Sequence, residues 1–280
     1  MQEMGETLRT TFRRMLRLEN RRAAVRHGRL EKIEAFESQI LGNTRQITIF
    51  LPAGYDDRDD RRYPVLYMHD GQNLFEGHRA FVPDNHWRLN EAADRAIGER
   101  TASPMIIVGI DHAGPSRVDE YTPTRDEARN SGGRAEDHAR MLAEELKPAI
   151  DARFRTIPDE TCVGGSSLGG LVSLYLALRH SDWVRGAAVM SPSVWWNNRA
   201  VLADVDRFDS SHRPRIWLDI GGREGLEALQ DARLLRDRLK SKGWRAEEDF
   251  LYYEDRRADH TERAWASRAR KPLEFLFPPT

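Results

Sequence analysis

Cysteine is almost absent from the sequence, because Cys162 is the single one among 280 residues. One cysteine rules out an internal disulfide and a metal site built from cysteines. Histidines and cysteines also do not cluster at metal-ligand spacing, so we expect neither a metal nor an organic cofactor. The N-terminal segment has no apolar run long enough for a signal peptide or a membrane span, which makes a cytoplasmic location the expectation.

An excess of charge of one sign is also missing. The 44 basic and 45 acidic residues give a net charge of -1, so nothing in the overall charge attracts nucleic acid. Only five of the basic residues are lysines, a bias that we take as compositional. With 39% hydrophobic and 32% charged residues, the chain is long enough for one large α/β domain and is not expected to form two small ones.

Residues 5–27 have the pattern of an amphipathic helix. Leu8, Phe12, Met15 and Leu16 fall on one side of it, and arginines cover the other faces. A basic amphipathic helix can bind a membrane surface or an acidic partner. We favour the simpler alternative, in which the apolar stripe packs on the body of the protein or joins two subunits into a homo-oligomer. The predicted organisation is an N-terminal helical arm over residues 1–28 and one domain over residues 29–280.

Short apolar runs alternate with helical patterns along the rest of the chain. Segments 32–38 and 45–51 predict a hairpin at the edge of a sheet. The later runs are apolar enough for strands buried on both faces, and they cover residues 64–69, 105–110, 161–165, 187–190, 215–220 and 249–253. Helical patterns at 88–99, 135–154, 168–180, 224–240 and 261–277 separate them. This alternation predicts a doubly wound α/β fold with a mostly parallel central sheet flanked by helices.

The segment Gly165-Ser166-Ser167-Leu168-Gly169 matches G-x-S-x-G, the tight turn that presents a serine nucleophile above a sheet. A strand-like run precedes it and a helical pattern follows it, as that turn requires. Side chains in place of the two glycines would crowd the strand and the helix as the chain reverses. At the start of a helix, the N–H of Leu168 is free to face developing negative charge. A phosphate-binding loop is the weaker alternative, because no lysine follows and no G-x-G-x-x-G is present.

A serine hydroxyl needs a base to remove its proton, and histidine is the usual one. His180, His212 and His260 follow Ser167, as the order Ser, acid, His requires. His180 ends the helix that Ser167 begins, about 20 Å away at 1.5 Å per residue. His212 precedes a strand and so falls at the opposite end of the sheet. His260 follows the last strand, at the carboxyl end where ligands bind in such sheets, and we predict it as the base.

The acid that orients the base should follow the strand at 215–220. Asp219 is still inside that strand, whereas Glu224 lies on the loop beyond it, where a side chain can turn toward the base. We favour Glu224, although a charge at the start of the next helix is its alternative role. Asp255 and Asp259 are close to His260 in sequence and rank lower.

A second donor for an oxyanion should come from a loop after an early strand. Asp70-Gly71-Gln72-Asn73 follows the strand at 64–69, and its glycine lets the backbone turn so that the N–H of Gln72 could face Ser167. Asp-Gly alone is more often only a turn. Residues 112–134, rich in proline, glycine, aspartate and arginine, form the longest irregular segment, and such segments are often lids or binding loops.

These motifs together resemble the esterase family of α/β-hydrolases, which includes enterochelin and other siderophore esterases, feruloyl and acetylxylan esterases, S-formylglutathione hydrolase and the mycolyltransferases. The likeness runs from about residue 40 to the C-terminus and keeps several motifs in order, which makes it specific. It is carried by YMHDGQNLF, DEYTPTRD, EELKPAIDARFRT, GGSSLGGLVSLYLALRHSDWVRGAAVMSPSVWW, LDIGGREG and DHTERAW. The resemblance implies an α/β-hydrolase catalytic domain over residues 29–280, to which the N-terminal helix is an addition.

By position, the resemblance implies that Ser167 is the nucleophile, Glu224 the acid and His260 the base. Gln72 and Leu168 would supply the backbone donors of the oxyanion hole. The EYTP segment, similar to one in siderophore esterases, points to the neighbourhood of Glu120, and SPSVWW points to a tryptophan pair, although adjacent tryptophans are more often packing residues. The residues expected at the substrate are Asp70, Arg117, Tyr121, Trp195 and Trp196.

The predicted function is a serine carboxylic-ester hydrolase that forms an acyl-enzyme on a small-molecule ester, such as a siderophore or aryl ester. One alternative is an acyltransferase on the same triad, in which an alcohol replaces the water. The other is a non-catalytic interaction protein that keeps the fold and uses the arginine-rich helix as its working surface. The intact set of serine, acid and histidine argues against this last alternative.

Overall fold

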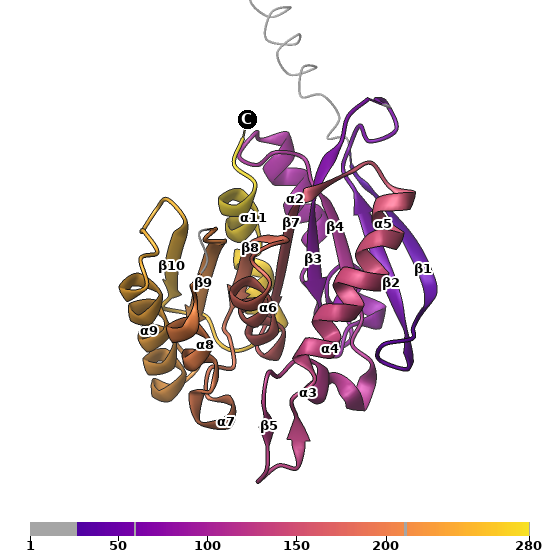
Figure 1. Cartoon of the computed structure of the whole chain (residues 1–280). Coiled ribbons are helices and arrows are strands. Elements are labelled where there is room, and N and C mark those ends of the chain that lie inside the picture. The colour runs from indigo at the N-terminus through magenta and orange to yellow at the C-terminus, as the bar shows by residue number, and fades with distance from the viewer. Residues whose placement is uncertain (1–26, 59, 210–211, 280) are drawn as a thin grey trace, which may run out of the picture.

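The structure is a computed structural model that describes residues 27–58, 60–209 and 212–279. The helix predicted over residues 5–27 lies outside this range except for His27. One sheet crosses the molecule, with helices on both of its faces (Figure 1). None of the helices in the described ranges combines the length and the apolar character that crossing a bilayer requires.

Eight strands form the main sheet, and their order in space is β1-β2-β4-β3-β7-β8-β9-β10. Strands β1 and β2 form the predicted antiparallel hairpin, β2 is also antiparallel to β4, and the other neighbours are parallel. The sheet is therefore mostly parallel, as predicted. The strands are β1 Arg29–Ser38, β2 Asn43–Leu51, β3 Tyr63–His69, β4 Ile106–Ile110, β7 Thr156–Ser166, β8 Val184–Met190, β9 Arg215–Gly221 and β10 Phe250–Asp255.

Helices form at all five predicted positions, but two of them are interrupted, and the helices at Arg117–Glu120, Trp196–Arg199 and Val201–Arg207 were not predicted. The predicted helix at 135–154 contains a π-helical stretch, Met141–Leu146, and the one at 261–277 divides at Ala269. Pro148 and Pro272 follow these interruptions and have no N–H to continue the helical hydrogen bonds. The helices are α2 Leu89–Gly98, α3 Arg117–Glu120, α4 Ala135–Arg140, α5 Lys147–Arg153, α6 Leu168–Arg179, α7 Trp196–Arg199, α8 Val201–Arg207, α9 Leu226–Ser241, α10 Glu262–Arg268 and α11 Arg270–Leu276.

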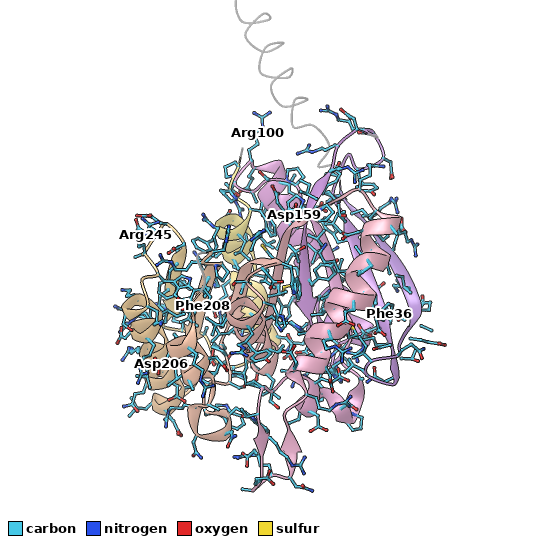
Figure 2. The ribbon with its side chains drawn as sticks, viewed as in Figure 1. Phe36, Arg100, Asp159, Asp206, Phe208 and Arg245 are labelled. Atoms are coloured by element: carbon cyan, nitrogen blue, oxygen red, sulfur yellow. The ribbon has the colours of Figure 1, made fainter. Side chains whose placement is uncertain are left out.

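The sheet separates two apolar cores, because side chains alternate between its faces. On β3, Val65 and Tyr67 belong to the core under α4, α5, α6, α8 and α9, whereas Leu66 and Met68 belong to the core under α2, α10 and α11. Figure 1 shows α6 and α9 in front of the sheet and α11 behind it. Side chains fill the space between these layers, with Phe36 at the β1 edge of the front core (Figure 2).

The carboxyl ends of the parallel strands meet at one edge of the sheet, where ligands bind in this class of fold. The segment 112–134 lies at this edge and contains a 3₁₀ turn (Gly114–Ser116), α3 and a small antiparallel hairpin of β5 (Arg125–Asp126) and β6 (Ser131–Gly132). That hairpin projects from the body (Figure 1). The indole N–H of Trp196 donates to the carbonyl of Thr124 at 2.9 Å, which ties this segment to α7.

Candidate active site

Ser167 occupies a tight turn between β7 and α6. Its φ of 57° and ψ of -121° lie in a region that residues other than glycine rarely adopt. A Cβ at Gly165 would lie 2.8 Å from the backbone of Gly169, and a Cβ at Gly169 would lie 3.2 Å from the side chain of His69. The two glycines are thus required by close approach of the strand, the helix and β3. A strained backbone like that of Ser167 is typical of functional sites.

The hydroxyl of Ser167 lies 3.2 Å from the hydroxyl of Ser193, which is buried. The N–H of Ser193 also donates to the carbonyl of Ser167 at 3.0 Å. Within the described part of the chain, Ser167 forms no hydrogen bond to His260, although both line the same cavity. Hydrogen bonds between a serine and a histidine at such sites are often long or absent until a ligand binds, and the arrangement seen here has that form.

His260 and Glu224 form a short hydrogen-bonded pair. Nδ1 of His260 is 2.7 Å from Oε2 of Glu224; the histidine side chain is 44% exposed and the glutamate side chain is 1% exposed. Because a carboxylate accepts hydrogen bonds, Nδ1 carries the proton and Nε2 remains free to act as a base. Burial raises the pKa of Glu224, but hydrogen bonds with His260 and Ser191 outweigh it and lower the pKa below its usual value.

A buried set of polar groups holds Glu224, and we call it the acid-side network. The hydroxyl of Ser191 is 2.5 Å from Oε1 of Glu224 and accepts hydrogen bonds from Arg268 at 2.7 Å and Trp265 at 3.0 Å. With its oxygen occupied by two donors, Ser191 directs its own hydrogen at Glu224. Arg268 in turn pairs with Asp219 at 3.0 Å, and burial raises the pKa of Asp219.

A second buried set lies on the other side of Ser167, and we call it the oxyanion-side network. Arg45 and Glu120 form an ion pair at 2.9 Å, and both side chains are fully buried. His138 lies 3.5 Å from Glu120 and 3.2 Å from Nε2 of His69. His69 ends β3 and is buried, and the loop that contains Gln72 follows it.

The loop after β3 turns sharply toward Ser167. Asp70 has a φ of 57°, and Gln72 lies in the 3₁₀ turn Gly71–Asn73 that follows. A Cβ on Gly71 would lie 2.6 Å from the backbone of β4, so the loop packs closely on the sheet. The N–H groups of Gln72 and Leu168 donate to no other group among the residues that the structure describes. Both donors are therefore available to a ligand.

Two cavities adjoin His260. The main cavity, of about 630 Å³, contains the side chains of Ser167 and His260 and is also lined by Asp70, Gln72, Phe81, Val82, His112 and Arg117. The second cavity, of about 450 Å³, is lined by His260, Ser193, Trp195, Glu224, Leu226 and Asp231. His260 thus lies between two spaces that could hold parts of one ligand.

The residues predicted at the substrate divide into two groups. Asp70 and Arg117 line the main cavity, where two hydrogen bonds of 2.7 Å join the carboxylate to the guanidinium. Trp195 is 43% exposed and lines the second cavity. Tyr121 and Trp196 differ from the expectation, because both are buried and neither is among the residues that line these cavities. Their polar atoms hydrogen-bond to the backbone, so these two side chains act in packing.

Sequence reasoning missed the groups that support the site. Ser191 and Ser193 follow β8 directly, at the same sheet edge as Ser167, and their place after a predicted strand was the available signal. Arg268 lies three residues after Trp265 on an otherwise apolar helix face, which also signals a buried charge. Arg45 and Glu120 are 75 residues apart, so no local pattern joins them.

Comparison with known proteins agrees with this architecture. The family model described as "Putative esterase" matches residues 38–271, and the chain belongs to this family. It is accordingly a carboxylic-ester hydrolase of the α/β-hydrolase fold. The solved structure of the BES protein from Bacillus cereus has a TM-score of 0.74 and 25% identity, over 89% of this chain and 94% of that one. The enterobactin esterase FES from Shigella flexneri shares the fold, with a TM-score of 0.68 and 20% identity over 88% and 59%.

Curated relatives include proteins with and without an assigned substrate. An uncharacterised protein of Bacillus subtilis, YbbA, is 25% identical over 86% of this chain and 95% of its own length. The siderophore enterobactin esterase of Emericella nidulans is 30% identical over 72% of each chain. The ferri-bacillibactin esterase BesA of Bacillus subtilis is 30% identical over 53% of this chain and 54% of its own length.

Proposed function

We propose that the protein hydrolyses its ester through an acyl-enzyme on Ser167. His260 takes the serine proton at Nε2 and passes it to the leaving alcohol, and Glu224 orients the imidazole and stabilises its positive charge. The observation that supports this most is the 2.7 Å contact of a buried Glu224 with a half-exposed His260, at a cavity that also contains Ser167.

The oxyanion donors in this proposal are the backbone N–H groups of Gln72 and Leu168. Support comes from their lack of another acceptor in the described ranges and from the position of Leu168 at the first turn of α6. A helix N-terminus presents free N–H groups and positive potential, which stabilise the negative charge of a tetrahedral intermediate.

The substrate in this proposal is a siderophore ester or another aryl ester of similar size. Two relatives act on siderophores by name, and a cavity of about 630 Å³ has the volume of sites for drug-sized ligands. Arg117 on its wall adds a positive group that hydroxyl or carbonyl oxygens of such a ligand can contact. We place the activity in the cytoplasm, as the sequence suggests; fractionation of cells that express the tagged protein tests this.

Replacing Ser167 with alanine tests the mechanism. We expect Ser167→Ala to abolish labelling by a fluorophosphonate and to lower ester turnover by ~10⁴-fold or more, with an unchanged melting temperature. Ser241→Ala, at the exposed end of α9, is the control and should keep both. Residual activity within tenfold of wild type would contradict the assignment of the nucleophile. A panel of p-nitrophenyl, feruloyl and ferric catecholate siderophore esters identifies the substrate class.

A further inference from the structure

Exposed apolar side chains gather around the two cavities. Five large apolar residues of the described chain are exposed, and four of them line one cavity or the other. Phe81 is 80% exposed and lies with Val82 on the main cavity, whereas Leu226 is 69% exposed and lies with Trp195 on the second. Exposed apolar surface that is concentrated at cavities indicates ligand contact.

The two cavities are lined by different reactive groups. The main cavity holds Ser167 and Gln72, so the carbonyl carbon that the serine attacks has to lie there. The second cavity is lined by His260 and Ser193 but is not lined by Ser167 or Gln72. A ligand group in the second cavity therefore contacts His260 but neither Ser167 nor Gln72.

From this arrangement we infer that the second cavity binds the alcohol part of the ester and the main cavity its acyl part. The inference rests on the proposed function of Ser167 and His260. As Oγ of Ser167 bonds to the carbonyl carbon, its proton moves to Nε2 of His260. That proton then moves to the alcohol oxygen as the carbon–oxygen bond breaks, and the alcohol leaves on the imidazole side. Water later attacks the acyl carbon, gives its proton to Nε2, and the serine recovers it as the acid leaves.

The lining of the second cavity defines the class of alcohol. Trp195 and Leu226 offer an apolar wall. Asp231 is 3% exposed, and one of its oxygens accepts a hydrogen bond from Arg199 at 2.5 Å. Its other oxygen, Oδ2, is buried and has no partner in the described chain. A buried acceptor without a partner is rare, and a ligand donor would satisfy it. The fitting alcohol has an apolar or aromatic group and an N–H or O–H donor, and carries no carboxylate.

The segment that presents Trp195 is strained. Asn197, Asn198 and Arg199 all have positive φ, at 44°, 55° and 64°. Consecutive left-handed residues other than glycine are unusual and cluster at ligand-binding sites. Asn197 also donates to the hydroxyl of Thr124 at 2.9 Å, which fixes this segment against the one before β5. The strained turn thus holds Trp195 at the second cavity.

The test uses butyrate esters that share one acyl group and differ in the alcohol. The alcohols are ethanol, N-(2-hydroxyethyl)benzamide and its N-methyl derivative, which lacks the N–H. We expect Trp195→Ala and Leu226→Ala to lower kcat/KM about tenfold for the benzamide ester and by a clearly smaller factor for the ethyl ester. Leu234→Ala is the matched control, since Leu234 is also exposed on α9 but lines neither cavity. Asp231→Leu should erase the preference for the N–H ester over its N-methyl counterpart.

Phe81→Ala provides the reverse test on the main cavity. It should alter the ratio of kcat/KM between ethyl butyrate and ethyl 3-phenylpropanoate, which differ only in the acyl group. It should leave the preference among alcohols intact. Equal loss on all esters in Trp195→Ala, or an alcohol preference that Phe81 controls, would overturn the assignment. Failure of the proposed function is separate, because it appears in the wild type as absent fluorophosphonate labelling. Leu234→Ala should label at the wild-type rate.

Discussion

Two buried ion pairs lie on opposite sides of Ser167, and they differ in where their hydrogen bonds lead. Arg268 and Asp219 in the acid-side network are 1% and 0% exposed, and Ser191 connects them to Glu224 and so to His260 at the cavity. Arg45 and Glu120 in the oxyanion-side network are equally buried but lead through His138 to a histidine that is itself sealed in the core. Burial of charge alone is therefore shared by both pairs, and the hydrogen-bonded connection to the cavity is what sets apart the pair beside the proposed catalytic residues.

Among the variants that test this comparison, replacement of Glu224 should lower turnover most. We expect Glu224→Gln to lower kcat by ~10³–10⁴-fold with the melting temperature kept, because the imidazole loses the group that fixes its tautomer. Asp219→Asn should act mainly through stability, since Asp219 contacts Trp217 and Arg268 and not His260. Turnover and melting temperature are measured on both variants side by side.

Two aspartates near His260 complete that test. Asp255→Asn and Asp259→Asn should have mild effects, because Asp255 contacts the backbone of Arg257 and Asp259 contacts Thr261. If Asp219→Asn or Asp255→Asn lost turnover at an unchanged melting temperature while Glu224→Gln stayed active, the acid would have to be reassigned. Ser167 and His260 would keep their proposed roles.

Removing one arginine from each network separates stability from turnover. Arg45→Met and Arg268→Met should each lower the free energy of unfolding by about 3–5 kcal/mol, because each leaves a buried carboxylate unpaired. Only Arg268→Met should also lower kcat, by about tenfold, since a shift of Glu224 misplaces the imidazole. Urea unfolding and turnover per fluorophosphonate-titrated site measure the two effects. A loss of turnover per site in Arg45→Met equal to that in Arg268→Met would remove the distinction.

The buried histidines of the oxyanion-side network and Glu224 of the acid-side network should respond to acid in different pH ranges. Burial lowers the pKa of His69 and of His138, so both stay neutral in the folded protein while the unfolded chain takes up protons below about pH 6.5. Stability should therefore decline as the pH falls through 6.5. The pKa of Glu224 is lowered, so its contribution is lost only as the pH falls below the usual carboxylate range, near 4.3.

Unfolding free energies from pH 8 to 4 check this order. His138→Gln should flatten the decline between pH 7 and 5.5, and Glu224→Gln should leave it in place. A decline that His138→Gln does not alter would show that other groups cause it.

Deleting residues 1–26 should have the smallest effect on turnover and tests whether the N-terminal segment contributes to it. The variant keeps His27 and Gly28, which hydrogen-bond to Asp94 on α2 at 3.2 and 2.8 Å. We expect turnover on a small ester within about twofold of wild type and a change in oligomeric state, because an apolar stripe needs burial. Light scattering measures the mass. Unchanged mass and melting temperature with lost turnover would assign the N-terminal segment to the active site.

Local patterns were enough to predict most of the fold and part of the site. The elbow at Ser167 and the strands around it follow from glycine spacing and apolar runs, which act within a few residues. β7 begins five residues before the predicted run, at Thr156, because sheet pairing extends a strand through polar residues that have no apolar signal. The order of the strands places Glu224 and His260 at the edge where Ser167 lies, which is why topology helped to select them.

The supporting groups could not be predicted because their contacts join distant segments. Arg268 reaches Ser191 across 77 residues, and only the fold brings them together. The tryptophan pair shows a limit of another kind. Trp195 and Trp196 are neighbours with the same side chain, yet one is exposed at a cavity and the other is 3% exposed in the core. The two side chains differ in burial because they lie one residue apart on a short turn and so point in different directions. Residue type alone does not predict this difference.

The single cysteine has a practical consequence for following the two cavities separately. Cys162 is buried beneath the elbow, and burial raises the pKa of its thiol to about 12, so it has almost no reactive thiolate at neutral pH. A cysteine introduced at Phe81 or at Leu226 would then be the one reactive thiol in the described part of the chain. Each cavity mouth can receive a fluorescent probe on its own, so under the proposed division of the ester a probe at Leu226 should report the departure of the alcohol and a probe at Phe81 the departure of the acid.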